Sequence, residues 1–407
     1  MKKLAAIILT VAMALTLCGC YDIYDPAENA PVPKYSVCVD FSNYADDTVL
    51  DEESGDCIFT QSVCEPTVIS AGNERAVDKI NADLELRNQS FIEGASAMKN
   101  LALSLVDENS RPGVMDETES VKSHKEGGIG PMTCVYQTAA TLTRGDVGVI
   151  SISYDTFTYS AGAAHGYVSR ECASYDSKTG EKLTLDTVAE DSALLRQLVY
   201  GYMLNISAGE KYQTDGTSIF FESDLTEELS ALVESEQWYF SDEGLVFFAN
   251  PYEMAAYAFG RVDFTVPYAA MDGLLKEKYM PVEFEGEAGM MLAESGENLD
   301  KGNLKLLGTV TLDADMQSVV VSAEETVYSV ELVKMRDDMI VMPETLVWYR
   351  SYMTTDEALE VICSIPDVSP NLILRYVLAD GTVIERGIFQ SGKDGSIMLV
   401  ELTDSEG

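Results

Sequence analysis

Basic residues, histidines and long apolar runs are all scarce in this sequence of 407 residues. Lys and Arg number 27 against 68 Asp and Glu, so the formal net charge is −41 at pH 7. Such a negative field repels nucleic acid, anionic lipid and acidic wall polymers, and it attracts cations and cationic proteins. The composition therefore excludes nucleic acid as a partner and favours a cationic one. Solubility alone is the alternative explanation of the charge.

Metal-binding patterns are missing as well. The chain has only two histidines, His124 and His165, and no CxxC pair or Cys/His cluster with zinc spacing. The turn DSKTGEK at 176–182 departs from a calcium loop, because Lys178 occupies the third position. We therefore predict no metal site and no cofactor.

The N-terminus lacks the roughly 20 apolar residues that a bilayer-spanning helix needs. Two lysines precede a shorter apolar stretch at 4–17, which is typical of a secretory signal. The sequence LCGC at 17–20 resembles a bacterial lipobox, which implies cleavage before Cys20 and lipidation of its thiol. Ordinary cleavage, with Cys20 left as a free thiol, is the alternative.

These features predict a lipoprotein signal peptide at 1–19 and a polar, proline-bearing tether at 20–33. Acyl chains on Cys20 would anchor the protein to the outer face of the cytoplasmic membrane, and we expect a Gram-positive bacterium as its source. Removing the signal takes two of the 27 basic residues and leaves 25 against 68 acidic ones, a charge of −43.

Six cysteines lie beyond Cys18 and Cys20. An even number suits disulfides in an exported protein, but six allow on the order of 15 connectivities, and buried free thiols are the alternative. The sequence leaves this choice open. They are Cys38, Cys57, Cys64, Cys134, Cys172 and Cys363.

Hydrophobic periodicity predicts an α+β fold, with helices packed on a mainly antiparallel sheet. Alternating apolar and polar residues indicate strands within 34–70. Apolar residues at spacings of three and four predict a long helix from Val77 to Leu105, and this stripe skips one turn at Asn88. Further strands, helices and a hairpin are expected at 132–144, 147–160, 192–204, 224–233 and 238–252.

The chain is predicted to divide into three folded parts. An N-terminal α+β region spans 34–145, and a second α+β domain spans 146–284. The acidic, glycine-bearing stretch 285–303 is interpreted as a linker. Seven or eight short strand-like runs then predict an all-β, sandwich-like domain at 304–407.

Three sequence blocks occur in an order that resembles a known family. They are YSAGAAHGYV, YDSKTGEKLTLDTV and YFSDEGLVFFANPYEMAAYAFGRVDFTVPY, all within 150–280. In this order they resemble the extracytoplasmic module of the RsiV-like family, and 34–145 resembles the PdaC-like domain that often precedes it. Ala256 departs from the family pattern, which usually has a proline before the tyrosine.

The resemblance implies an exported module that binds cell-envelope ligands, in a family that includes lysozyme sensors. Other members accompany a peptidoglycan deacetylase domain. The Asp-Asp and His-x-x-x-His pattern of such a deacetylase is not found in this sequence. The resemblance therefore favours binding over catalysis.

His165 lies in a glycine-bearing turn and allows several interpretations: a catalytic base, a metal ligand, a residue that fixes the turn, or a ligand contact. Cys172 and Asp155 would complete a nucleophilic site with it. However, Cys172 follows seven residues later on one predicted strand, about 23 Å away. We therefore favour the turn-fixing role, followed by ligand contact. Four tyrosines flank the turn and suit either an interface or a packed sheet face: Tyr154, Tyr159, Tyr167 and Tyr175.

Together these observations predict a cell-surface lipoprotein that acts as a binding or sensor module. The expected ligand is a cationic envelope protein such as lysozyme, or peptidoglycan fragments. The alternative is a cell-wall-modifying hydrolase whose site assembles from acidic residues. The predicted ligand-binding residues are His165, Tyr159, Tyr167, Tyr252 and Tyr257.

Overall fold

The computed structural model describes most of the chain beyond the N-terminal region. Its content of 44% strand and 26% helix agrees with the α+β class. Cys20, the signal peptide, the tether and His124 all lie outside the described residues. The described ranges are 35–52, 54–106, 133–281, 291–295, 305–312, 317–323, 327–336, 339–340, 344–363, 372–378, 381–390 and 397–402.

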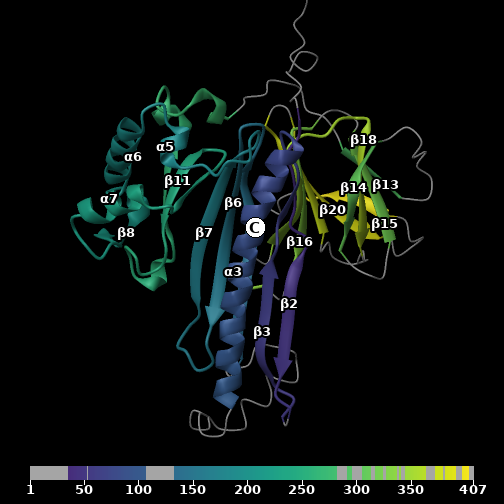
Figure 1. The fold of residues 1–407 in the computed structure, drawn as a ribbon, viewed down its shortest axis with the longest axis horizontal. Coiled ribbons are helices and arrows are strands. Elements are labelled where there is room, and N and C mark those ends of the chain that lie inside the picture. The colour runs from purple at the N-terminus through teal and green to yellow at the C-terminus, as the bar shows by residue number, and fades with distance from the viewer. Residues whose placement is uncertain are drawn as a thin grey trace, which may run out of the picture.

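A five-stranded sheet forms the centre of the molecule (Figure 1). The central β5 pairs in parallel with β3 and antiparallel with β6, and the two outer pairs are antiparallel. In sheet order the strands are β2 (Tyr44–Leu50), β3 (Cys57–Cys64), β5 (Cys134–Gly145), β6 (Val149–Tyr159) and β7 (Tyr167–Asp176).

Helix α3 (Glu74–Val106) packs against strands β3 and β5 of this sheet, as the apolar stripe predicted. Ile80, Leu84 and Phe91 are buried in the core beneath it. Each such side chain contributes about 1.5–3 kcal/mol when fully buried. Tyr154 and Tyr175 lie in the same core, so for these two tyrosines the packed sheet face is the correct interpretation.

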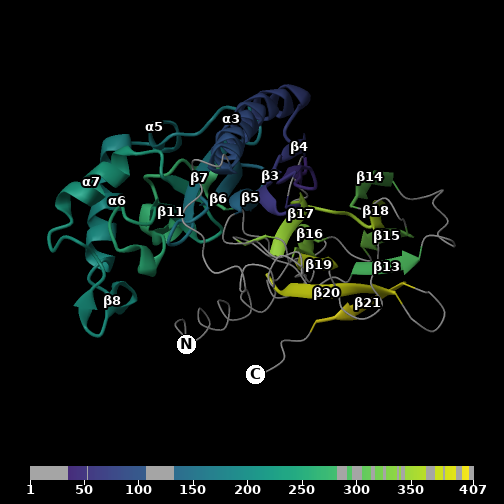
Figure 2. The same cartoon turned by 90° about the horizontal axis from the view of Figure 1, so that it is seen from below.

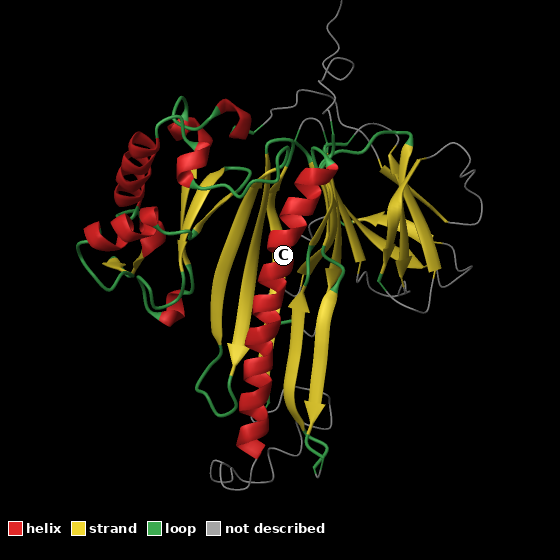
Figure 3. Cartoon of the chain, viewed as in Figure 1, coloured by secondary structure: helices red, strands yellow, loops and turns green. Residues whose placement is uncertain are grey.

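A second lobe follows β7 and has its own core (Figure 3). Its three-stranded antiparallel sheet is β10 (Trp238–Phe240), β11 (Gly244–Ala249) and β12 (Val262–Pro267). The lobe also contains α5 (Leu185–Val188), α6 (Ser192–Ile206), α7 (Thr226–Glu234), the short pair β8 (Gln213–Thr214) and β9 (Thr217–Ser218), and the 3₁₀ turns η1 (Glu210–Tyr212), η2 (Tyr257–Phe259), η3 (Tyr268–Met271) and η4 (Glu277–Tyr279).

The C-terminal strands form two sheets that share a core (Figure 2). The four-stranded sheet has the order β13 (Met291–Ser295), β15 (Gln317–Ala323), β18 (Glu357–Cys363) and β14 (Lys305–Thr311). The seven-stranded sheet has the order β21 (Ile397–Glu401), β20 (Val383–Gln390), β19 (Leu372–Val377), β16 (Ser329–Met335), β17 (Glu344–Arg350), β1 (Cys38–Asp40) and β4 (Thr67–Ser70).

The predicted division into separate parts does not follow the hydrogen bonding. Strand β1, from the predicted N-terminal region, pairs with both β4 and β17, so the C-terminal sheet includes N-terminal strands. The predicted boundary at 145/146 also falls inside the β5–β6 hairpin. Pairing partners about 300 residues apart leave no local signal in a sequence, which is why composition suggested independent domains.

The predicted linker 285–303 is wrong at Met291–Ser295. These five residues form β13 and pair along their length with β15. A strand of weak intrinsic preference forms where a partner strand supplies its hydrogen bonds, since β propensity depends on context. The rest of the predicted linker lies outside the described residues.

The cysteines whose side chains are described are free thiols rather than disulfides. They are Cys38, Cys57, Cys64, Cys134 and Cys172. The side chain of Cys363 lies outside the described set. Within the described ranges, none of the helices is both long and apolar enough to cross a membrane.

Candidate ligand-binding surface

The turn between β6 and β7 depends on two glycines. Gly162 has φ of 81°, a left-handed conformation that glycine adopts without steric cost. At Gly166, a Cβ would lie 2.2 Å from the ring of Phe157, so a side chain has no room there. The Tyr159 hydroxyl donates to the carbonyl of Ala163 at 3.3 Å. Tyr159, one of the predicted contact residues, therefore braces this turn.

His165 is held in one orientation at the tip of the turn. Its Nδ1 lies 2.7 Å from the carbonyl oxygen of Gly166, and its Nε2 lies 3.3 Å from the hydroxyl of Tyr252. Since a carbonyl only accepts, the neutral ring carries its proton on Nδ1, and Nε2 accepts from the tyrosine. The predicted turn-fixing role agrees with this geometry.

The His165 ring also stacks on tyrosines from a distant loop. The centroids of His165 and Tyr257 are 4.2 Å apart with an interplanar angle of 24°, and those of Tyr252 and Tyr257 are 5.6 Å apart. These spacings suit offset stacking of aromatic rings. We call these three residues the aromatic surface. The structure thus brings together three of the five predicted contact residues.

Tyr252 is presented in an unusual conformation. Its φ is 73°, which is uncommon for any residue with a bulky side chain, and 53% of its surface is exposed. Glu253 stabilises the loop by accepting from the backbone N–H of Asn250 at 2.6 Å. Strain of this kind persists only where neighbouring contacts enforce it, and it concentrates at functional sites.

Other exposed aromatics lie close in the sequence to this surface. Tyr167, two residues after His165, is 38% exposed, and Phe259, in η2 with Tyr257, is 42% exposed. Tyr167 has no ring contact with the aromatic surface among those found in the described residues. This predicted contact residue therefore flanks the stack without joining it.

A buried ionic network supports the surface from below. Asp155 on β6 accepts from Arg170 on β7, including a 2.9 Å bond from Nε, and from Arg261 at 3.1 Å. Asn250 clasps the backbone of Arg170, accepting from its N–H at 2.7 Å and donating to its carbonyl at 3.3 Å. These bonds fix the loop that bears Tyr252 to strand β7.

Sequence reasoning missed Arg170, Arg261 and Asn250 as supporting residues. Their partners lie up to 106 positions away in the chain, so no spacing pattern reveals them. A weak signal was available in the scarcity of arginine within so acidic a sequence. In such a sequence each arginine has many possible carboxylate partners. An arginine close in the sequence to a predicted site therefore merits a search for the carboxylate that it binds.

Nucleophilic chemistry at His165 is not supported by the geometry. Cys172 is buried, and its thiol points to the carbonyl oxygen of Trp238 at 2.8 Å. Burial raises the pKa of the Cys172 thiol to about 12, so it stays protonated at neutral pH. Asp155 is already held by two arginines.

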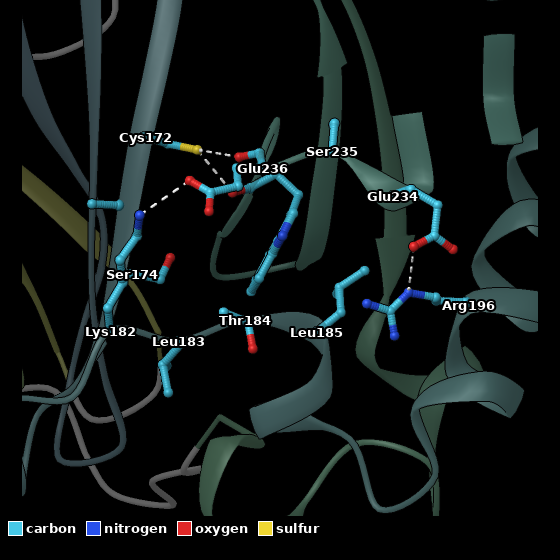
Figure 4. A pocket seen from close by; sticks show the side chains of 12 residues that line it. Cys172, Ser174, Lys182, Leu183, Thr184, Leu185, Arg196, Glu234, Ser235 and Glu236 are labelled. Atoms are coloured by element: carbon cyan, nitrogen blue, oxygen red, sulfur yellow. Dashed lines mark hydrogen bonds and ion pairs between the residues drawn. The ribbon is translucent and has the colours of Figure 1, made fainter. Parts of the chain in front are cut away.

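Cys172 lines a small pocket between β7 and the second lobe (Figure 4). The pocket has a volume of about 180 Å³, below the roughly 300–1,000 Å³ of typical ligand sites. Its charged side chains are paired: Lys182 with Glu236 at 3.1 Å, and Arg196 with Glu234 at 3.3 Å. Across the described ranges, no three His, Cys, Asp or Glu side chains are grouped to hold a metal ion.

A larger cleft opens where the central sheet, the second lobe and the C-terminal sheet meet. It has a volume of about 330 Å³, and Asp146, Asp242 and Glu331 line it. Burial raises the pKa of Asp242, helped by the negative charges of Asp146 and Glu243. Burial likewise raises the pKa of Glu331, against the opposing charge of Arg375.

The architecture is that of an α+β protein with loop-borne aromatic side chains at one end of its central sheet. Within it, residues 197–269 match the profile of DUF3298, a family described as "Protein of unknown function (DUF3298)". The chain therefore contains a DUF3298 domain, which includes Tyr252 and Tyr257 and lies inside the predicted 146–284 region. No curated protein matches this chain.

Two solved structures of DUF3298 family proteins are similar to this chain. One, from Bacteroides fragilis NCTC 9343, is 15% identical in sequence and has a TM-score of 0.39. The match covers 58% of this chain and 92% of the solved chain. The other, from Pseudomonas aeruginosa PAO1, is 12% identical in sequence and has a TM-score of 0.32. Here the match covers 62% of this chain and 98% of the solved chain.

Proposed function

We propose that this chain is a cell-surface lipoprotein whose aromatic surface binds an envelope ligand, as a binding or sensor module of the RsiV-like kind. The observation that carries the proposal is the stacking of His165, Tyr252 and Tyr257, which come from loops 87 positions apart. Exposed tyrosines give large contact areas at little entropic cost, and they are enriched at interfaces.

The preferred ligand is a cationic protein, with lysozyme as the model partner. The net charge of −41 raises encounter rates with basic proteins. Charge alone gives weak association with any basic protein, and it weakens with salt because the Debye length is only about 8 Å at physiological ionic strength. Specific binding therefore needs the aromatic surface to slow dissociation.

Surface plasmon resonance of the chain from residue 21 onward tests this proposal. Lysozyme, cytochrome c and soluble peptidoglycan fragments are compared at low and physiological salt. We expect Tyr257→Ala to speed lysozyme dissociation about tenfold or more, a loss of roughly 1.4 kcal/mol. Leu194→Ala, which removes a 50% exposed residue on α6, is the matched control.

Equal binding of lysozyme and cytochrome c, lost together at physiological salt and indifferent to Tyr257→Ala, would leave only a soluble acidic surface. Binding of peptidoglycan fragments alone would support the aromatic surface as a binding site, but its ligand would then be peptidoglycan instead of a cationic protein. Anchoring is tested separately, because Cys20→Ala should abolish labelling by fatty-acid analogues. Unchanged labelling in that variant would remove the lipoprotein part of the proposal.

A hydrolase remains the second candidate because of the cleft lined by Asp242 and Glu331. A carboxyl whose pKa is raised can act as a general acid, and glycoside hydrolysis uses two carboxyl groups. The test is turnover of peptidoglycan by the wild-type chain and by Asp242→Asn. Release of reducing ends that Asp242→Asn abolishes would favour the hydrolase, and no release by either would dismiss it.

A further inference from the structure

A groove lies between helix α3 and the connection from β3 to β4, away from the aromatic surface. Its volume is about 480 Å³, within the range of roughly 300–1,000 Å³ typical of small-molecule sites. Four of its nine lining residues carry carboxamides, and we call it the amide groove. The residues that matter here are Asn43, Glu65, Asn81, Glu85, Asn88 and Ile92.

Asn88 lines this groove and carries an unsatisfied polar atom. The residue is only 9% exposed, and its carboxamide oxygen is buried without a hydrogen-bond partner. Such an atom costs about 1–3 kcal/mol, and buried polar groups in native proteins are rarely left in this state. Asn88 is also the point where the apolar stripe of α3 is interrupted. A leucine there would continue the stripe, so the asparagine breaks a local rule at the groove.

The neighbouring carboxamides each use one N–H in a hydrogen bond within the groove wall. Asn81 accepts from the backbone N–H of Val68 at 2.8 Å and donates to its carbonyl at 2.9 Å. Asn43 donates to the Glu65 carboxylate at 2.6 Å. These bonds order the groove wall, and each of these two carboxamide nitrogens keeps a second N–H, so the wall offers donors as well as acceptors.

The donors and acceptors of the wall together define the ligand's chemistry. The Asn88 oxygen requires a donor, and the carboxylates of Glu65 and Glu85 accept donors and repel anions. Ile92 adds an apolar contact beside them. A hydroxyl-rich ring with an apolar face supplies both kinds of contact without a negative charge. We propose that the amide groove binds a neutral sugar unit of an oligosaccharide.

This site is separate from the proposed function, because α3 and β4 contribute no residue to the aromatic surface. The two proposals can therefore fail independently. Tyr257→Ala should leave sugar binding by the amide groove unchanged, whereas changes in the groove should leave protein binding at the aromatic surface unchanged.

Isothermal titration of the full chain from residue 21 onward tests the inference with three probes. Tri-N-acetylchitotriose and maltotriose are neutral sugars, and glucosamine carries an ammonium group. We expect saturable binding of at least one neutral sugar, weakened about tenfold or more by Asn88→Leu. The same variant should unfold at an equal or higher temperature, since it removes an unsatisfied polar group. Arg75→Ala, an exposed change on α3 outside the groove, is the control.

The absence of saturable binding of both neutral sugars at about 10 mM, a Kd weaker than any useful site, would overturn the inference. Binding that Asn88→Leu leaves unchanged would overturn it too, and binding of glucosamine alone would make the groove a cation site. If Asn88→Leu fails to fold, Glu85→Gln and Gln89→Ala at the exposed rim replace it. Unchanged affinity in both would then contradict the proposal.

Discussion

Strand β7 has two halves that differ in burial. Residues 172–176 are buried, whereas Tyr167 and Glu171 are exposed and the residues between them are half-buried. In the buried half, the Tyr175 hydroxyl donates to Asp83 on α3 at 2.6 Å. The open half leads back to His165 and the aromatic surface.

The comparison separates residues that hold the fold from residues available to a ligand. The buried half is covered by α3 and β10, so its side chains contribute to stability. The open half lacks such cover. There an ionic network fixes the loop that bears aromatic rings, and these rings contribute little to the core. Backbone strain held at an exposed position, as at Tyr252, concentrates at functional sites, and this is the ground on which we propose the aromatic surface as a binding site.

The largest expected effect is on the buried half. Tyr175→Ala should lower the free energy of unfolding by about 3–5 kcal/mol, because it removes a buried aromatic side chain. Tyr167→Ala, the matched change in the open half, should alter it by no more than about 0.5 kcal/mol. Chemical denaturation measures both values, and equal losses would erase the distinction between the halves.

A change at Asp155 tests how much the ionic network below the open half contributes to stability. Asp155→Ala leaves Arg170 and Arg261 without their shared carboxylate and should cost about 3 kcal/mol, as breaking a buried ion pair does. Lys99→Ala removes an exposed pair with Asp47 and should cost less than about 1 kcal/mol. Similar losses in the two variants would show that the network is no more than a surface ion pair.

Acid should weaken the buried half through Asp176. Burial opposes its charge, but hydrogen bonds from Lys278 and from the backbone N–H of Thr179 outweigh this and lower the pKa of Asp176. A lowered folded-state pKa adds stability above the ordinary value, near 4, and that stability disappears as pH falls through the folded-state pKa.

Asp176→Asn should therefore cost about 1–2 kcal/mol at pH 7 and almost nothing near pH 2. Denaturation curves across this range measure the difference, with the exposed Asp215→Asn as the control. If the loss of unfolding free energy in Asp176→Asn does not change with pH, the altered packing of the side chain, and not its lost charge, destabilises the protein.

Local patterns in the sequence predicted the elements well, because periodicity depends on neighbours in the chain. The stripe from Val77 to Leu105 became helix α3, and the short C-terminal runs became strands. Strand parity could not separate Tyr167 from Tyr175, which are eight residues apart on one strand. The cover that buries only Tyr175 comes from α3, about 90 positions earlier.

The candidate site was predicted as a set of residue types, and its arrangement was not. His165, Tyr252 and Tyr257 were selected as contact residues, but their stacking depends on a loop-to-loop contact. The same limit hid the pairing of β1 with β17, whose residues are about 310 positions apart. Such contacts follow from the global topology, which a single sequence encodes only indirectly.

Hydrogen–deuterium exchange of the chain with and without lysozyme, repeated with soluble peptidoglycan fragments, tests directly whether the aromatic surface is the binding site. We expect slower exchange at 160–168 and 250–260, the two loops of the aromatic surface, and no change at 172–176. Tyr252→Ala should abolish the protection without changing the free energy of unfolding by more than about 0.5 kcal/mol. Protection elsewhere on the chain with both loops unaffected would contradict the assignment of this surface as the binding site.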